Sequence, residues 1–209
     1  MLSSYLASVS SPETQKPVAR LPVLENSLSK SNLKALELGA GCGIVGITLS
    51  QLFSSHISRV ILTDLPEATE ILTQNLSPSV LRSLGSGRIT HQVLDWSSPL
   101  PSDIKSTVWD MILVADCTYN PDVVPDLVKT IRELVGISKE AIVLLAMKVR
   151  HDSELIFFDL MKEKNLRVKE TIAIPLPVLG GEDEEIEIFV FGLEGTLGSG
   201  GDKRKVGLE

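Results

Sequence analysis

A glycine-rich turn at residues 39–43 constrains this chain more than any other stretch. A short apolar segment ends at Leu38, glycines follow at positions 39, 41 and 43, and an apolar helical pattern covers residues 44–52. This order predicts a strand, a tight turn and a helix. Glycine lets the backbone adopt positive φ and lets a ligand approach where a Cβ would collide. The free N–H groups at the start of the helix favour a negatively charged ligand group.

Three interpretations of the turn are open. Residues 41–46 match the G-x-G-x-x-G fingerprint of dinucleotide-binding proteins. The same region taken from Glu37, which reads E-L-G-A-G-C-G, resembles the first motif of class I S-adenosylmethionine (AdoMet) methyltransferases. The third interpretation is a structural turn without a ligand. The glycine turn alone does not distinguish these three interpretations, so residues further along the chain are needed.

Length and composition indicate one globular domain. The 209 residues are enough for a sizeable core, and 43% of them are hydrophobic. No apolar run reaches the roughly 18 residues that indicate a membrane span, and no signal peptide is apparent. The net charge of −7 argues against a nucleic-acid surface, because phosphate binding usually needs a basic face. It leaves room for a basic protein or peptide partner.

The cysteines and histidines do not indicate a metal site. Cys42 and Cys117 lack C-x-x-C spacing, so they support neither a zinc site nor a disulfide framework. His56, His91 and His151 are scattered along the chain and are interpreted as surface residues. We therefore expect no metal and a reducing, cytoplasmic location.

Acidic and aromatic residues end the next two predicted strands. Residues 59–63 form a β-branched segment that ends at Asp64, whose carboxylate can accept both hydroxyls of a ribose. A strand over residues 88–94 ends at Asp95 and Trp96. This pair suits an adenine, because the carboxylate accepts from the exocyclic amine and the indole packs on the base. The alternative is that Trp96 is an ordinary rim or core aromatic.

The fourth predicted strand, residues 109–115, is apolar enough to be buried on both faces. It brings Asp116 and Tyr119 to the carboxyl edge of the sheet. A helix follows over residues 123–135. The alternatives are that Asp116 is a helix N-cap or turn residue and that Tyr119 simply packs against this helix.

The remaining pattern completes an α/β domain. Further strands are predicted at residues 140–147, 166–174 and 185–193, and the last two should pair antiparallel because no helix separates them. Helices are expected at residues 66–75 and 153–164, and residues 10–32 and 78–87 are expected to be loops.

This order predicts a Rossmann-like class I AdoMet methyltransferase fold. The sheet of this fold has seven mostly parallel strands and a C-terminal antiparallel hairpin. The predicted order of strands and helices fits this architecture better than it fits two mirrored dinucleotide-binding halves. The ligand should lie at the carboxyl ends of the strands, near the topological switch beside the first strand.

Four motifs together resemble methyltransferase family 16, the seven-β-strand protein-lysine methyltransferases. They are E-L-G-A-G-C-G from Glu37, Thr63–Asp64, Leu94-Asp95-Trp96 and A-D-C-T-Y from Ala115. The likeness runs from about Leu33 to Leu193, and the fungal elongation-factor enzymes look most similar. The resemblance implies an enzyme with AdoMet as cofactor and a lysine of a cytoplasmic protein, such as a translation elongation factor, as methyl acceptor. It implies a monomer, with neither nucleic acid nor membrane as a partner.

The resemblance also implies site residues. Glu37 would meet the amino group of AdoMet through water, Asp64 would hold the ribose, and Ala115 would lie near the sulfonium. Asp116 and Tyr119 would be catalytic and would line the channel for the target lysine. The full set of implied cofactor-binding residues is Glu37, Gly39, Ala40, Gly41, Gly43, Asp64, Asp95, Trp96 and Ala115.

Three parts of the chain are expected. Residues 1–32 are a partial N-terminal helix with a Pro/Ser-rich loop, residues 33–193 are the methyltransferase domain, and residues 194–209 are a disordered tail. In the family, a W-x-A-A segment precedes the first strand and its indole covers the cofactor. Leu2–Ser8 resembles the end of that helix, so we expect a missing upstream region and a pocket open on one side. The alternative is a short form that covers its cofactor with residues 10–32.

Two other functions fit the same sequence. One is N-methylation of a small amine such as a pyridine, and the other is a non-catalytic binding module. No insertion suggests the helical lid of small-molecule enzymes, and the cofactor residues are all present, so the lysine enzyme is favoured. The acidic residues 182–187 are interpreted as a solvated rim, or alternatively as a surface that attracts a lysine-rich substrate.

Overall fold

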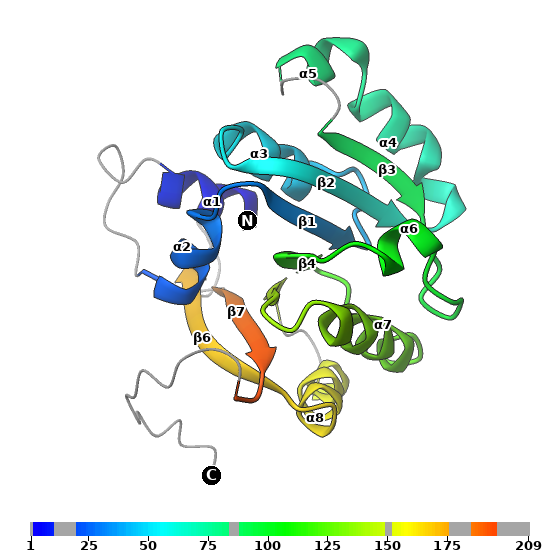
Figure 1. Ribbon diagram of the computed structural model, residues 1–209. Helices are drawn as coiled ribbons and strands as arrows, with labels where there is room; N and C mark the ends of the chain where they lie inside the picture. The colour runs from blue at the N-terminus through cyan, green and yellow to red at the C-terminus, as the bar shows by residue number, and fades with distance from the viewer. Residues whose placement is uncertain (1, 11–19, 84–87, 149–151, 176–184, 196–209) are drawn as a thin grey trace, which may run out of the picture.

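A seven-stranded sheet lies between two layers of helices in the computed structural model (Figure 1). The structure describes residues 2–10, 20–83, 88–148, 152–175 and 185–195. The strand order is β3-β2-β1-β4-β5-β7-β6, and only β7 runs against its neighbours. The strands are β1 (Leu33–Leu38), β2 (Ile57–Asp64), β3 (Ile89–Val93), β4 (Met111–Ala115), β5 (Ile142–Met147), β6 (Leu166–Pro175) and β7 (Glu185–Leu193).

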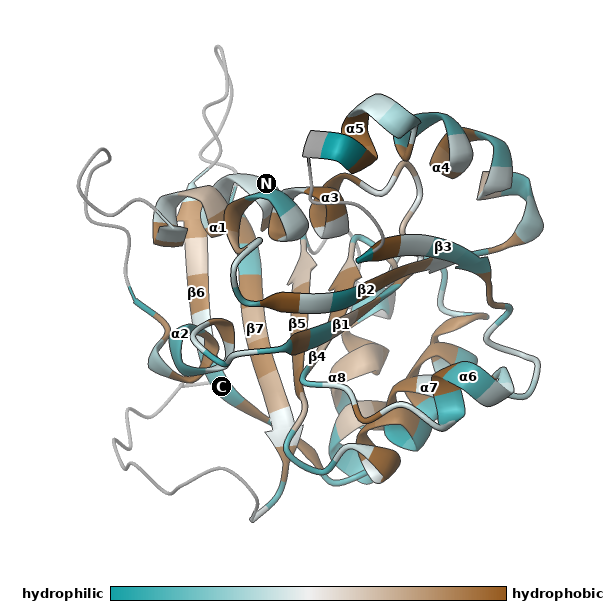
Figure 2. Ribbon diagram, turned by 45° about the horizontal axis from the view of Figure 1, so that its top comes forward, coloured by the Kyte–Doolittle hydropathy of each residue, from teal (hydrophilic) through white to brown (hydrophobic). Residues whose placement is uncertain are grey.

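The helices form one layer on each face of the sheet (Figure 2). The first layer consists of α1 (Leu2–Ser10), α2 (Pro22–Leu28), α3 (Ile44–Leu52), the 3₁₀ turn η1 (Pro66–Ala68), α4 (Thr69–Asn75) and α5 (Pro78–Ser83). The second layer consists of α6 (Ser102–Lys105), α7 (Val124–Ile137), the 3₁₀ turn η2 (Asp152–Leu155) and α8 (Ile156–Glu163).

The central strands are buried on both faces. In β4, Met111 and Leu113 pack in the core cluster under α1 and α3, whereas Ile112 and Val114 pack in the cluster under α7 and α8. All four side chains are fully buried. Strands covered by helices on both faces consist of continuous apolar residues, which is why this segment lacks the polar alternation of a surface strand.

The predicted fold class is confirmed, with local corrections. Residues 10–32 were expected to be a loop but contain α2, and residues 78–87 were expected to be a loop but contain α5. Both helices begin at a proline, which fits the first helical position because its missing N–H has no intrahelical partner there. The expected helix at 66–75 is the turn η1 followed by α4. The predicted tail beyond residue 195 and the acidic residues 182–184 lie outside the described residues.

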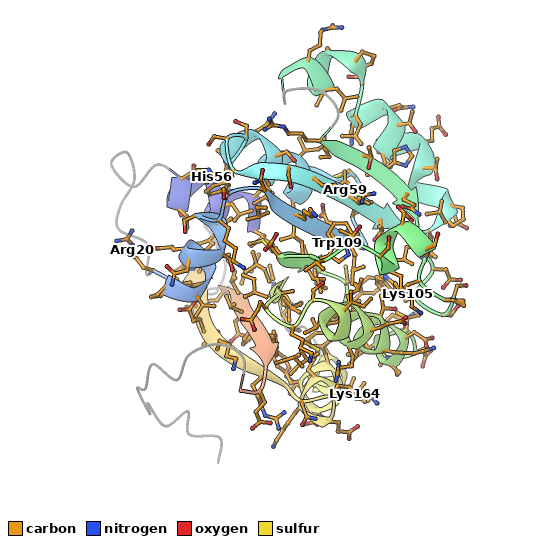
Figure 3. The ribbon with its side chains drawn as sticks, viewed as in Figure 1. Arg20, His56, Arg59, Lys105, Trp109 and Lys164 are labelled. Carbon is orange, nitrogen blue, oxygen red and sulfur yellow. The ribbon has the colours of Figure 1, made fainter. Side chains whose placement is uncertain are left out.

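Trp109 is a structural residue at the start of β4. Its ring is 1% exposed, and its indole N–H donates to the carbonyl of Ile104 at 3.1 Å. The guanidinium of Arg59 lies 5.7 Å from the ring centroid, and Figure 3 shows the two side chains together. The hydrogen bond from Trp109 to Ile104 holds α6 against the sheet. Among the described residues, no helix has both the length and the apolar character of a membrane span.

Candidate active site

Two adjoining cavities lie at the carboxyl ends of β1 and β4. After β1 the chain continues toward β2 and β3, and after β4 it continues toward β5, so the direction of winding reverses between these two strands. Open α/β sheets bind ligands at such a switch point. One cavity has a volume of about 590 Å³ and reaches Glu37, and the other has a volume of about 700 Å³ and reaches Asp64 and Asp95. Gly39, Ala40, Ala115 and Asp116 line both.

The glycine turn forms the floor between the two cavities. Gly39 has a φ of +65°, and a Cβ there would lie 2.6 Å from Cys117 Sγ and 3.2 Å from the Trp96 ring. Gly41 has a φ of +55° with open space around its missing Cβ, so only its backbone conformation favours glycine there. Gly43 has a φ of +79° and is the N-cap of α3, but it does not line either cavity. Its direct contact with the cofactor therefore stays a prediction.

Asp64 joins the turn to the larger cavity. Its Oδ2 accepts the backbone N–H of Gly41 at 2.7 Å, and its Oδ1 accepts that of Leu65 at 2.7 Å. A carboxylate has about four lone-pair positions, so two acceptor positions remain for ligand hydroxyls. Asp64 also lines the cavity wall. The residue is therefore suited both to fixing the turn and to accepting from a ribose.

Removing the Asp64 carboxylate should weaken AdoMet binding. Asp64→Ala deletes the acceptor for two hydroxyls and loosens Gly41, and a hydrogen bond to a charged group is worth about 1.5–3 kcal/mol, or about 10- to 150-fold in Kd. Titration calorimetry measures this loss. Asp103→Ala is the matched control, because Asp103 also accepts side-chain hydrogen bonds but does not line either cavity. Equal losses in both variants, or unchanged affinity in Asp64→Ala, would contradict the assignment.

Asp95 and Trp96 lie together on the far side of the larger cavity. Hydrogen bonds from the Ser97 hydroxyl, at 2.8 Å, and from its backbone N–H, at 2.9 Å, lower the pKa of Asp95. The Trp96 carbonyl accepts the Thr130 hydroxyl of α7 at 3.3 Å, and the ring packs against the α7 side of the core. Trp96 is thus a packed aromatic that also lines the cavity, so its position is compatible with both earlier interpretations. Its contact with adenine stays a prediction.

Glu37 lies at the base of the smaller cavity. It is 2% exposed, and its Oε2 accepts the backbone N–H of Gly46 at 2.9 Å. Burial raises the pKa of Glu37 to about 8; the hydrogen bond from Gly46 opposes this rise, and the charge of Asp64 adds to it. A Cβ at position 46 would overlap Leu62 and lie 2.7 Å from Oε2, so glycine in α3 makes room for the carboxyl group. Glu37 is therefore mostly protonated at pH 7 in the free protein.

Asp116 lies where the two cavities meet. It has a φ of +55°, which is uncommon for a residue other than glycine, and its backbone N–H donates to Ala146 at 2.9 Å. The N-cap of α7 is Val123, so Asp116 is not the cap of that helix. Tyr119 is 67% exposed at the larger cavity, which excludes burial against α7 as its role. The catalytic roles of both residues stay predictions.

Several residues that line the cavities were not among the predicted site residues. Cys117 is buried, its thiol donates to the carbonyl of Leu38 at 3.4 Å, and burial raises its pKa to about 12. Lys148 follows β5 at the smaller cavity. Leu2, Ser3 and Ser4 of α1 line that cavity too, and the expected opening on one side of the pocket stays a prediction. Cys117 lies within the A-D-C-T-Y motif, and the resemblance of Leu2–Ser8 to the helix near the cofactor pointed to α1, whereas Lys148 had no such signal. Within the described residues, no group of His, Cys, Asp and Glu side chains could hold a metal ion.

The sheet order, the reversed β7 and the glycine turn between β1 and α3 define the class I AdoMet methyltransferase fold. A solved structure of a SAM-dependent methyltransferase from Methanosarcina mazei matches with a TM-score of 0.57 over 85% of this chain and 100% of that one, at 15% identity. The chain belongs to the lysine methyltransferase family, whose model matches residues 1–164.

Curated relatives agree with this family. EEF1A lysine methyltransferase 3 of Xenopus tropicalis is 32% identical over 79% of this chain and 66% of its own length. Protein-lysine N-methyltransferase EFM2 of Saccharomyces cerevisiae is 30% identical over 69% of this chain and 36% of its own length. The chain thus spans between about one third and two thirds of these relatives. The predicted family and the AdoMet cofactor are confirmed.

Proposed function

We propose that this chain transfers a methyl group from AdoMet to the side-chain amine of a lysine in a protein. The observation that carries this proposal is the position of Asp116 between a cavity reaching Glu37 and a cavity reaching Asp64 and Asp95. A carboxylate at this junction can accept a hydrogen bond and a proton from an amine that approaches a cofactor bound in the two cavities. The family membership supports the lysine as acceptor.

The described residues fit AdoMet. Gly39 lacks the Cβ that would close the cavity floor, Glu37 offers a buried carboxyl group for an ammonium, and Asp64 keeps free acceptor positions for a ribose. Asp95 and Trp96 suit an adenine by the same reasoning. When bound, AdoMet supplies a methyl group on a sulfonium, which an amine can attack in line.

The chain itself positions the amine and controls its proton. A free lysine has a pKa of about 10.4 and is protonated at neutral pH, yet only the neutral amine attacks. A narrow channel with little water disfavours the ammonium form. Asp116 accepts a hydrogen bond from the amine and the proton that it loses, and Tyr119 covers the channel with its ring. Positioning of this kind supplies most of the acceleration.

A translation elongation factor is the proposed substrate class. One relative carries EEF1A in its name, and other relatives are named protein-lysine N-methyltransferases. A substrate of this kind places the reaction in the cytoplasm. Methylation of a small amine is the second candidate, because the larger cavity is exposed at Tyr119 and nothing there distinguishes a free amine from a lysine side chain.

Transfer of a labelled methyl group tests the proposal directly. The protein is incubated with methyl-labelled AdoMet and either purified elongation factor 1A or a lysate passed through a desalting column. We expect label in protein, recovered as methyl-lysine after acid hydrolysis. Label found only when the small-molecule fraction is added back would favour the small-amine enzyme. Binding of AdoMet without transfer in either fraction would favour a non-catalytic module.

A further inference from the structure

A β-bulge in β6 changes which face of the sheet its side chains reach. Val168 pairs with Phe191 and Glu170 pairs with Val190, so Lys169 is an extra residue in β6. Before the bulge, Leu166 packs in the core cluster under α7 and α8, and after it Ile172 packs against the opposite cluster under α1 and α3. Even-numbered residues of a regular strand would all share one face. The bulge therefore turns Glu170 toward the layer that contains α1 and α2.

Glu170 caps the N-terminus of α2 from a distant part of the sequence. Its Oε1 accepts the backbone N–H of Val23 at 2.8 Å, and its Oε2 accepts that of Leu24 at 3.3 Å. The N-cap residue itself, Leu21, makes no side-chain cap bond. The first N–H groups of a helix have no intrahelical partner, so this carboxylate supplies two acceptors that the local sequence lacks.

The core cluster on which α2 packs also contains residues of α1 and is contacted by Ile172 of β6. Tyr5 of α1 is 3% exposed; burial first, and then the charges of Glu25 and Glu170, raise its pKa to about 12. Leu6 of α1 and Leu24 of α2 are fully buried in one core cluster with β7. Residues of α1, α2 and β6 thus pack in one core cluster, and Glu170 joins β6 to α2 beside it. Figure 1 shows α1 and α2 on the side of the sheet where β6 and β7 lie.

The position of α1 sets one wall of the smaller cavity. Leu2, Ser3 and Ser4 line that cavity together with Glu37 and Gly39. We propose that Glu170 is a positioning residue, which fixes α1 and α2 against the sheet and thereby shapes the end of the site that receives the methionine part of AdoMet. This inference rests on the proposed function only for the identity of the ligand.

Substitution of Glu170 tests the inference by hydrogen exchange and by binding. In Glu170→Ala, we expect amide exchange in residues 2–10 and 22–28 to accelerate by about tenfold, as the loss of a helix cap predicts. The Kd for AdoMet should rise severalfold, while kcat at saturating AdoMet should stay near the wild-type value. Glu170→Gln keeps one acceptor oxygen and should recover part of both losses. Glu163→Ala, an exposed glutamate in the opposite helical layer, is the control and should change neither.

Two results would overturn the inference. One is wild-type exchange in α1 and α2 of Glu170→Ala. The other is equal acceleration in all elements, α7 and α8 included, because that outcome indicates general destabilisation rather than local positioning. If the wild-type protein does not bind AdoMet, the proposed function fails. The exchange data still decide whether Glu170 holds α1 and α2, so the two failures are distinguishable.

Discussion

Replacing Glu37 with glutamine is expected to stabilise the free protein at pH 8. Burial raises the pKa of the Glu37 carboxyl group from its ordinary value of 4.5 to about 8. Below pH 4.5 this group is protonated in the folded and the unfolded chain, so its contribution to stability is fully present. As the pH rises from 4.5 to 8, Glu37 ionises in the unfolded chain but stays mostly protonated in the folded one. The unfolded state is therefore favoured increasingly, and the contribution to stability is lost. Glutamine does not ionise and can still accept from Gly46.

The size of the gain follows from the change in pKa. Each pKa unit corresponds to about 1.4 kcal/mol, so Glu37→Gln should gain up to about 4 kcal/mol relative to the wild type at pH 8 and little at pH 4.5. Denaturant unfolding of both proteins across this range measures the difference. A gain that is the same at both ends of the range would show that the substitution acts by packing rather than by removing an ionisable group.

The same substitution should weaken AdoMet binding. An ammonium group in the smaller cavity favours the ionised carboxylate, so binding at pH 7 should release up to about one proton from Glu37. Titration calorimetry in buffers of different ionisation enthalpy measures this release. Glu37→Gln should bind at least about tenfold more weakly, since it loses the buried negative charge that favours the ammonium, and should release no proton from this position. Equal proton release in both proteins would contradict the role of Glu37.

Much of the site was predictable from the sequence, because its acidic residues lie directly at the carboxyl ends of predicted strands. Asp64, Asp95 and Asp116 each follow an apolar segment, and parallel strands bring their carboxyl ends to one edge. The glycine turn was predictable for the same reason, since its conformation depends on adjacent residues. The prolines that indicated loops were less reliable, as α2 and α5 show, because proline also begins helices.

The rest depends on residues that are far apart in sequence. Glu170 accepts from Val23 across 147 positions, and no local pattern in β6 indicates the bulge that turns it. Gly46 appeared to be only the last glycine of a fingerprint, yet its missing Cβ accommodates the Glu37 carboxyl group. The contribution of α1 to the cavity wall is likewise a tertiary effect, because it depends on packing of α1 on α3 and on the core cluster that α1 shares with α2.

Replacing Asp116 with asparagine should remove methyl transfer and leave AdoMet binding nearly intact. Asn is the suitable substitution, because Asp and Asn tolerate the positive φ at this position, +55°, better than Ala does. The variant keeps the size of the side chain but cannot take up the proton of the amine. General-base catalysis contributes about 10²- to 10⁴-fold, so kcat should fall by that factor.

The comparison of kcat with Kd separates this role from a structural one. Single-turnover kinetics at saturating AdoMet give the rate of transfer, and calorimetry gives the cofactor affinity. Asp122→Asn is the matched control, because Asp122 is exposed in the same loop and does not line either cavity. If Asp116→Asn binds AdoMet poorly but transfers at the wild-type rate once saturated, Asp116 serves the cofactor and not the amine. In that case, the proton of the lysine must leave through another group at the junction of the two cavities.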